Sequence, residues 1–252
     1  MVTIGSKTKR WLWAWLLLPA AFQIAIQSVS VSADQGEDRF TTLRKSMVRE
    51  QIAEARGFRD PVKDEQVLEA MGRVPRHLFV NPSDVPRAYG DHPLPIGYGQ
   101  TISQPYIVAL MTEMLDVRPG HRVLEVGTGS GYQAAILSVL VEEVCTVEIV
   151  DPLARQAADR LKRLGYENAH VKIGDGYFGW EQKGPFDRII VTCAATLVPP
   201  PLLRQLKAGG KMCIPVGGQY AVQSLTMVEK AQDGGITMRK TIPVRFVPLV
   251  RR

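Results

Sequence analysis

The chain has 252 residues, and its 31 basic and 25 acidic side chains give a formal net charge of +6. Residues 1–33 hold three of the basic side chains and no acidic ones, which leaves 28 basic against 25 acidic side chains, or +3, for the rest. A surplus this small, without a basic run interleaved with aromatic residues, argues against a nucleic-acid-binding protein. The part of the chain after residue 33 is long enough for one α/β domain with a full core.

The first 33 residues have the three parts of a secretory signal peptide. Basic residues precede an apolar run over residues 11–26, and small side chains follow at Val31 and Ala33. The apolar run is about 16 residues long, shorter than the roughly 20 that a transmembrane helix needs. We therefore expect cleavage after Ala33 and a periplasmic or secreted protein.

Two alternatives for the N-terminus stay open. An uncleaved leader would be a membrane anchor, the one way in which we expect this chain to meet a membrane. A true start at Met47, which opens a plausible cytosolic N-terminus, would make the protein cytoplasmic. If the leader is a cleaved signal peptide or an uncleaved anchor, residues 34–40 form a polar linker and residues 41–252 form a single domain. Nothing in the sequence demands a second copy, so we expect a monomer.

The cysteines and histidines do not form a metal site. Cys145, Cys193 and Cys213 each lie in an apolar run, and their odd number without a C-x-x-C pair is neither a disulfide framework nor a zinc site. We expect buried core thiols. The four histidines stand at no metal-ligand spacing, and we expect no metal.

Helical periodicity marks the first half of the chain, over residues 41–55, 64–74 and 104–117. Between the last two helices, residues 75–103 are rich in proline and glycine. Long irregular segments in compact domains are commonly functional, so this segment is a candidate for the site.

The second half alternates strand and helix. This spacing predicts βαβ units and a mostly parallel, doubly wound sheet. Two final strands joined by a glycine turn predict an antiparallel edge at the C-terminal end of the sheet. The expected strands are 122–127, 144–150, 169–175, 186–195, 211–217, 223–231 and 236–250, and the expected helices are 130–141, 151–165 and 199–210.

The stretch VLEVGTGSGYQ, residues 123–133, places three glycines directly after a strand. Gly127, Gly129 and Gly131 leave the backbone bare where a ligand approaches closely. Dinucleotide sites favour G-x-G-x-x-G, with the diphosphate at the helix N-terminus. Here the spacing is G-x-G-x-G, and Glu125 would repel a diphosphate but suit an ammonium group. S-adenosyl-L-methionine, which has an ammonium and no phosphate, is therefore favoured over a nicotinamide cofactor.

Two more acidic residues stand at the ends of the next two strands, where they could contact the ribose and the base of a bound nucleoside. Glu148, 17 residues after Gly131, ends a strand where a carboxylate accepts hydrogen bonds from both ribose hydroxyls. Asp175 ends the third strand and is placed to meet an adenine amine. A lone glycine loop is often only a tight turn, but the loop and these acids together predict a nucleoside site.

The glycine loop and the segment GYGQTISQP together resemble the protein-L-isoaspartate O-methyltransferase family. The resemblance runs from about Met47 to the end and includes VPRHLFV, GDGYFGW, PFDRIIVTCAA and VRFVPLV. It implies a Rossmann-like class I methyltransferase fold with N-terminal helices. It also implies methyl transfer from S-adenosyl-L-methionine to the free α-carboxylate of isoaspartyl residues in damaged proteins and peptides. The N-terminal leader departs from the family, which is mostly cytosolic.

The resemblance also implies roles for single residues. Ser103 is the active-site residue, and the segment around residues 244–249, including Val247, folds over the damaged peptide. The residues implied to line the acceptor pocket are Gln100, Thr101 and Ile102, and those implied to hold the cofactor are Glu125, Gly127, Thr128, Gly129, Gly131, Glu148, Asp175 and Gly176.

This chemistry agrees with the residues present. A carboxylate that attacks a sulfonium methyl is already ionised near pH 7, so no general base is required. Positioning and electrostatics then carry the rate, and a hydroxyl such as that of Ser103 can orient an oxygen without reacting. Two other functions stay open: a non-catalytic protein that binds S-adenosylmethionine or peptides on the same fold, and a methyltransferase for another acceptor, because fold alone does not determine the substrate.

Overall fold

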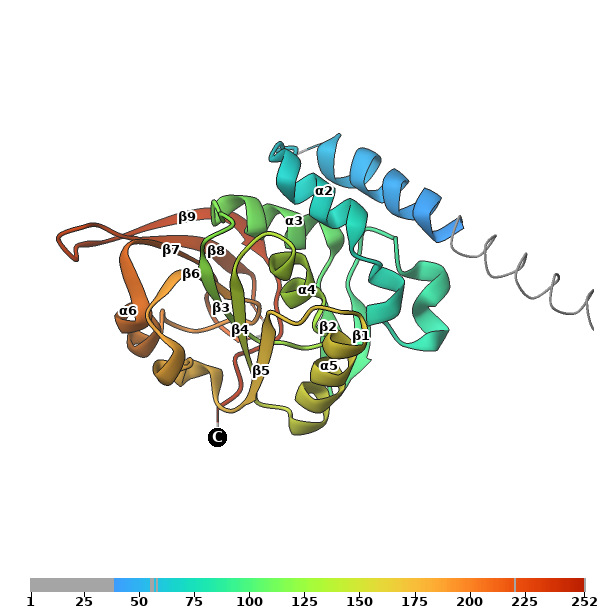
Figure 1. The fold of residues 1–252 in the computed structure, drawn as a ribbon. Helices are drawn as coiled ribbons and strands as arrows, with labels where there is room; N and C mark the ends of the chain where they lie inside the picture. The colour runs from blue at the N-terminus through green and yellow to red at the C-terminus, as the bar shows by residue number, and fades with distance from the viewer. Residues whose placement is uncertain (1–38, 55–56, 58, 220, 252) are drawn as a thin grey trace, which may run out of the picture. The chain divides into compact units, whose positions relative to one another are not determined.

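Figure 1 shows the fold in a computed structural model, which describes residues 39–54, 57, 59–219 and 221–251. The expected leader, residues 1–33, lies outside the described residues. Among the residues that are described, no helix is both long and apolar enough to cross a membrane. Residues 39–46 are α-helical, which includes the last two residues of the expected linker, and the π-helical turn η1 follows at Met47–Ala53.

The two other expected N-terminal helices are present as α2, Glu65–Arg73, and α3, Pro105–Met114. Asp64 caps the N-terminus of α2: its carboxylate accepts hydrogen bonds from the amides of Gln66 and Val67 and so satisfies two free N–H groups of the first turn.

The segment between α2 and α3, expected to be irregular, contains short regular elements. Two 3₁₀ turns, η2 at Arg76–Phe79 and η3 at Pro82–Arg87, precede a hairpin of β1, Leu94–Gly97, and β2, Gln100–Ile102. In this hairpin Ile102 lies opposite Leu94, and both side chains are buried. Ser103 therefore follows directly after a strand that is anchored in the core.

The main sheet confirms the predicted architecture. Its strand order is β5-β4-β3-β6-β7-β8-β9, parallel from β5 to β7 and antiparallel from β7 to β9. Helices α4, Tyr132–Ser138, and α5, Asp151–Arg163, follow β3 and β4 in the chain. The strands are Arg122–Val126 (β3), Glu143–Glu148 (β4), Ala169–Ile173 (β5), Phe186–Val191 (β6), Leu206–Val216 (β7), Gln223–Lys230 (β8) and Ile236–Val244 (β9).

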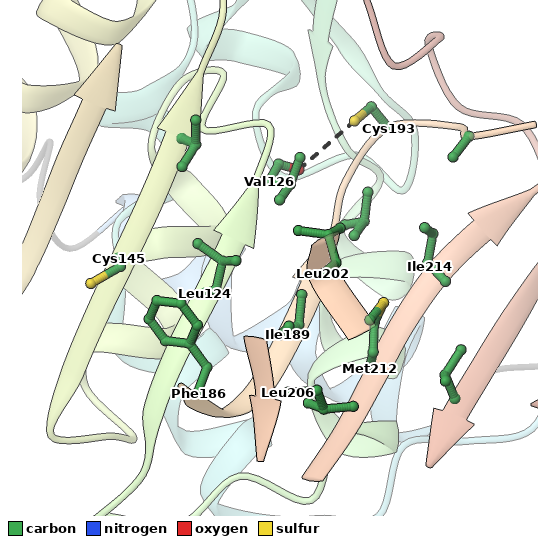
Figure 2. Packing of buried hydrophobic residues seen from close by; sticks show 14 residues of the cluster. Leu124, Val126, Cys145, Phe186, Ile189, Cys193, Leu202, Leu206, Met212 and Ile214 are labelled. Carbon is green, nitrogen blue, oxygen red and sulfur yellow. Dashed lines mark hydrogen bonds between the residues drawn. The ribbon is translucent and has the colours of Figure 1, made fainter. Parts of the chain in front are cut away.

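Figure 2 shows the core on one face of this sheet. Leu124 and Val126 of β3 point to this face together with Ile189 and Met212 from neighbouring strands, and Leu202 of α6, Pro200–Gln205, packs against them. The three cysteines are buried free thiols, as expected. Because side chains alternate along a strand, Glu125 lies on the opposite face from Leu124 and Val126.

Two expected boundaries differ most from the structure. The helix predicted over residues 199–210 ends at Gln205, and residues from Leu206 onward belong to β7. Gly209 has a φ of +74° and stands beside a second glycine, so this stretch favours leaving the helix. The last strand, predicted to continue to residue 250, ends at Val244. The chain beyond it makes one parallel bridge, from Pro248 to Ala194, and leaves the sheet.

Candidate active site

A narrow pocket opens at the carboxyl ends of β3, β4 and β6. In the sheet β3 lies between β4 and β6, so the chain order reverses at this point. Open α/β sheets bind ligands at such a reversal because the loops on its two sides separate and leave a crevice. The pocket wall includes Glu125 of β3, Gly127 and Thr128 directly after it, Glu148 at the end of β4 and Thr192 after β6.

The first glycine of the loop is required by a close approach of backbone and side chain. Gly127 has a φ of +100°, and a Cβ atom there would lie 2.5 Å from Oγ1 of Thr192. That hydroxyl donates a hydrogen bond of 2.6 Å to the Gly127 carbonyl, and the Gly127 amide donates to Val147 at 2.9 Å. Gly129 also lies in the wall. Gly131 lies outside it, where a Cβ atom would meet Leu161 of α5 at 3.4 Å.

Glu148 is held in the wall by the glycine loop. Its two carboxylate oxygens accept hydrogen bonds from the amides of Gly129, at 2.8 Å, and Val150, at 2.9 Å. The side chain is buried, so these bonds fix its orientation at the end of β4. The Thr128 hydroxyl makes a 2.6 Å hydrogen bond with the hydroxyl of Thr146 and is therefore also fixed.

Glu125 is the least satisfied group in the pocket. Its side chain is fully buried, and neither carboxylate oxygen has a hydrogen-bond partner among the described residues. Burial is the main cause that raises the pKa of Glu125 to about 8; the nearby Thr146 hydroxyl opposes this rise, and the charge of Glu148 adds to it. An unpartnered acid in a pocket wall is a suitable partner for a cationic ligand group.

Asp175 lies beside the pocket and not in its wall. Its carboxylate accepts a hydrogen bond from the Tyr177 amide at 2.9 Å and forms an ion pair with Arg251 at 2.8 Å. The guanidinium of Arg251 also lies 3.6 Å from the ring centre of Tyr177. Its neighbour Gly176 does line the pocket, and a Cβ atom there would lie 2.4 Å from Val126. The expected contact of Asp175 with an adenine amine stays a prediction.

A second, wider cleft of about 1260 Å³ adjoins the pocket. Gln100, Thr101 and Ser103 line both spaces, and so does the tail from Val247 to Val250. Ile102 lines the pocket only. The structure therefore brings the expected acceptor residues together where the pocket meets the cleft. The hydroxyl of Ser103 is half-buried there and makes no hydrogen bond to another described residue.

Three residues near this junction were missed by sequence reasoning. Thr192 and Gln133 line the pocket, and Gln133 donates a 3.0 Å hydrogen bond to the hydroxyl of Thr112. Arg76 lies behind Ser103 and donates a hydrogen bond to its carbonyl. A polar residue in an otherwise apolar run was the available signal for Gln133 and Thr192. In the described part of the chain, no cluster of three or more His, Cys, Asp or Glu side chains could hold a metal ion.

The arrangement suits transfer of a group between two ligands. The narrow pocket has the acids and bare backbone for a small cationic nucleoside, and the wide cleft has room for part of a polymer. The two ligands would meet at Ser103. Together with the sheet order, this site defines the Rossmann-like class I fold of methyltransferases that use S-adenosylmethionine.

Comparisons with known proteins identify the family. The family model described as protein-L-isoaspartate(D-aspartate) O-methyltransferase matches residues 46–252. Protein-L-isoaspartate O-methyltransferase 2 of Polaromonas sp. is 60% identical over 189 residues, which cover 75% of this chain and 90% of that protein. Protein-L-isoaspartate O-methyltransferase 1 of Cupriavidus necator is 53% identical over 239 residues, which cover 93% and 91%.

A solved structure agrees. A Plasmodium falciparum protein assigned to the same family, in complex with S-adenosyl-L-homocysteine, has a TM-score of 0.70 and 28% identity, over 83% of this chain and 99% of its own. The chain therefore belongs to the protein-L-isoaspartate(D-aspartate) O-methyltransferase family.

Proposed function

We propose that the chain repairs damaged proteins by transferring a methyl group from S-adenosyl-L-methionine to the free α-carboxylate of L-isoaspartyl residues. Family membership and the relatives at 53–60% identity support this activity. The observation that carries it is the junction at Ser103, where a pocket suited to the cofactor opens into a cleft wide enough for a peptide.

In this proposal the pocket residues hold the cofactor by charge and by backbone contact. Glu148, already oriented by the amides of Gly129 and Val150, accepts hydrogen bonds from the ribose hydroxyls. Glu125, unpartnered among the described residues, faces the ammonium group. Gly127, Gly129 and Gly176 leave the backbone open to the cofactor, and Thr128 lies beside them in the wall. Gly131 allows the close packing of α4 on α5, and Asp175 is proposed to meet the adenine amine at the edge of the pocket.

The acceptor peptide lies in the cleft. The isoaspartyl residue is enclosed by Gln100, Thr101 and Ile102 on one side and by Val247 on the other. Ser103 orients its free α-carboxylate by donating a hydrogen bond. The cofactor supplies an electrophilic methyl group. One carboxylate oxygen forms the new O–C bond as the C–S bond breaks, and the electron pair of that bond stays on sulfur. No proton moves, so the protein contributes orientation and exclusion of water.

The test uses methyl-labelled S-adenosyl-L-methionine and two peptides that differ only in isoaspartate or aspartate at one position. We expect base-labile methyl ester on the isoaspartyl peptide alone. Ser103→Ala is expected to lower turnover strongly while the affinity for S-adenosyl-L-homocysteine stays nearly the same, because Ser103 touches the acceptor side of the junction. Labelling of neither peptide, with cofactor binding intact, would contradict the proposed activity. Unchanged turnover of the serine variant would contradict the role of Ser103 only.

We also propose that residues 1–33 direct export and are removed, which leaves one methyltransferase domain outside the cytoplasm. The basic, apolar and small-residue parts of the leader support this. Sequencing the N-terminus of the protein isolated from its natural source is expected to give Asp34. A start at Met47 would overturn export, and an intact leader in the membrane fraction would indicate an anchor.

A further inference from the structure

Arg76 is a fully buried cation that the chemistry proposed above does not use. It lies in η2 with none of its surface exposed. Among the residues that the structure describes, no carboxylate lies within ion-pair distance of it, and its Nη1 atom has no hydrogen-bond partner. Burying a charge without an ion partner is costly. Such an arrangement suggests a specific task for the bonds that Arg76 does make.

Those bonds join two segments that are distant in sequence. The Nε atom donates to the carbonyl of Ala88 at 2.8 Å, and Nη2 donates to the carbonyl of Ser103 at 2.7 Å. The guanidinium lies 4.9 Å from the ring centre of Tyr132, a residue that contributes to the wall of the cofactor pocket. Arg76 therefore contacts both the residue expected to orient the acceptor and the wall of the cofactor pocket.

Ser103 has no other support at this carbonyl from a strand or helix. It stands between β2, which ends at Ile102, and α3, which begins at Pro105. On the C-terminal side of Ser103, the side chain of Asp91 holds the start of α3. Its carboxylate accepts hydrogen bonds from the side chain of Gln104, at 2.8 Å, and the amide of Tyr106, at 3.3 Å. The bond from Arg76 is therefore the contact that holds the backbone at residue 103 itself, from which the serine side chain projects.

We propose that Arg76 is a positioning residue for the methyl transfer: its guanidinium fork fixes the backbone of Ser103 so that the hydroxyl meets the acceptor carboxylate. This inference rests on the role of Ser103 proposed above. The planar fork is the essential feature, because two donors in fixed geometry reach the carbonyls of Ala88 and Ser103 together. A lysine keeps the charge but offers a single flexible head, so it cannot hold both carbonyls in the same way.

The experiment compares R76K and R76Q, each alone and in the S103A background, for kcat and KM with an isoaspartyl peptide. R76Q removes the buried charge and its desolvation cost, so it provides a folded variant for the test if R76K is too unstable. The matched control is R188K. Arg188 is also buried and donates to the carbonyls of Leu115 and Asp116, but it lies near the start of β6, at the opposite end from the pocket. Melting temperature and affinity for S-adenosyl-L-homocysteine are measured for every variant.

We expect both Arg76 variants to lose at least tenfold in kcat while their affinity for S-adenosyl-L-homocysteine changes less than twofold. In the S103A background the same changes should alter kcat less than twofold, since a positioning residue has nothing left to position. R188K should lower the melting temperature without this pattern. The inference would be overturned by wild-type kcat in R76Q. It would also be overturned if the Arg76 changes lowered kcat in the S103A background by the same factor as in the wild-type background. Wild-type kcat in S103A alone would instead overturn the proposed role of Ser103.

Discussion

Glu125 should make the stability of the protein fall as pH rises through the neutral range. Its carboxyl is fully buried without a hydrogen-bond partner among the described residues, and burial raises its pKa from an ordinary value of 4.5 to about 8. The folded state therefore holds this proton more tightly than the unfolded state. The stabilisation is complete below about pH 4.5 and is lost as pH rises through about 8.

The size of the effect follows from linkage between the two pKa values. Between pH 6 and pH 8 the unfolded carboxyl is ionised and the folded one is largely protonated, so this group alone lowers the free energy of unfolding by about 2 kcal/mol. E125Q keeps the size of the side chain and removes the titration. We expect the difference in unfolding free energy, E125Q minus wild type, to grow by that amount over this range in urea titrations without cofactor.

Glu143 provides a control of opposite sign. Burial of Glu143 would raise its pKa, but hydrogen bonds from Arg122 and Lys183 outweigh burial and lower the pKa. Its stabilising contribution is therefore present above an ordinary carboxyl pKa and is lost only in acid, so E143Q should run parallel to wild type between pH 6 and pH 8. If E125Q also ran parallel, the unpartnered, raised-pKa state of Glu125 would be refuted.

The same state predicts release of a proton when the cofactor binds. An ammonium group beside Glu125 favours the carboxylate and lowers its pKa. Binding of S-adenosyl-L-homocysteine at pH 7 should then release close to one proton in wild type and none in E125Q. Isothermal titration in two buffers of different ionisation enthalpy measures this. Equal proton release by the two proteins would refute the proposed contact between Glu125 and the ammonium.

Two further variants test the pocket walls. Gly176→Ala would place a Cβ atom 2.4 Å from Val126, so we expect a loss of about 1–3 kcal/mol in stability and at least tenfold weaker cofactor binding by calorimetry. Gly174→Ala is its control, since the nearest atom there is 3.5 Å away, and equal effects of the two changes would contradict this account. Arg251→Ala removes the half-exposed ion pair with Asp175, so stability should change by less than about 1 kcal/mol. The tail that lines the pocket loses one of its two anchors, the other being the bridge to Ala194, and S-adenosyl-L-homocysteine should dissociate faster in stopped-flow measurements. An unchanged rate would mean that this ion pair does not control release of the ligand.

Local patterns in the sequence were enough to predict most of the architecture. Apolar strands separated by amphipathic helices predict the parallel sheet, because alternation and helical periodicity are properties of neighbouring residues. The glycine loop and Glu148 could be placed at the pocket for the same reason, since each follows directly after a strand. The end of α6 was predicted wrongly because the choice between helix and strand after Gln205 depends on distant pairing: Leu206 pairs with Phe186 of β6, and from Lys211 onward β7 pairs with both β6 and β8.

The sequence by itself therefore determined the fold class, the family resemblance and the order of the loop, the acids and Ser103 along the chain. Only the tertiary structure decided which charges are buried and what they contact. Arg76 is 27 residues from Ser103, and Arg251 is 76 residues from Asp175, yet each pair is in hydrogen-bond contact. Whether a charged side chain is buried, paired or left without a partner depends on chain segments that meet only after folding, so no local pattern contains that information.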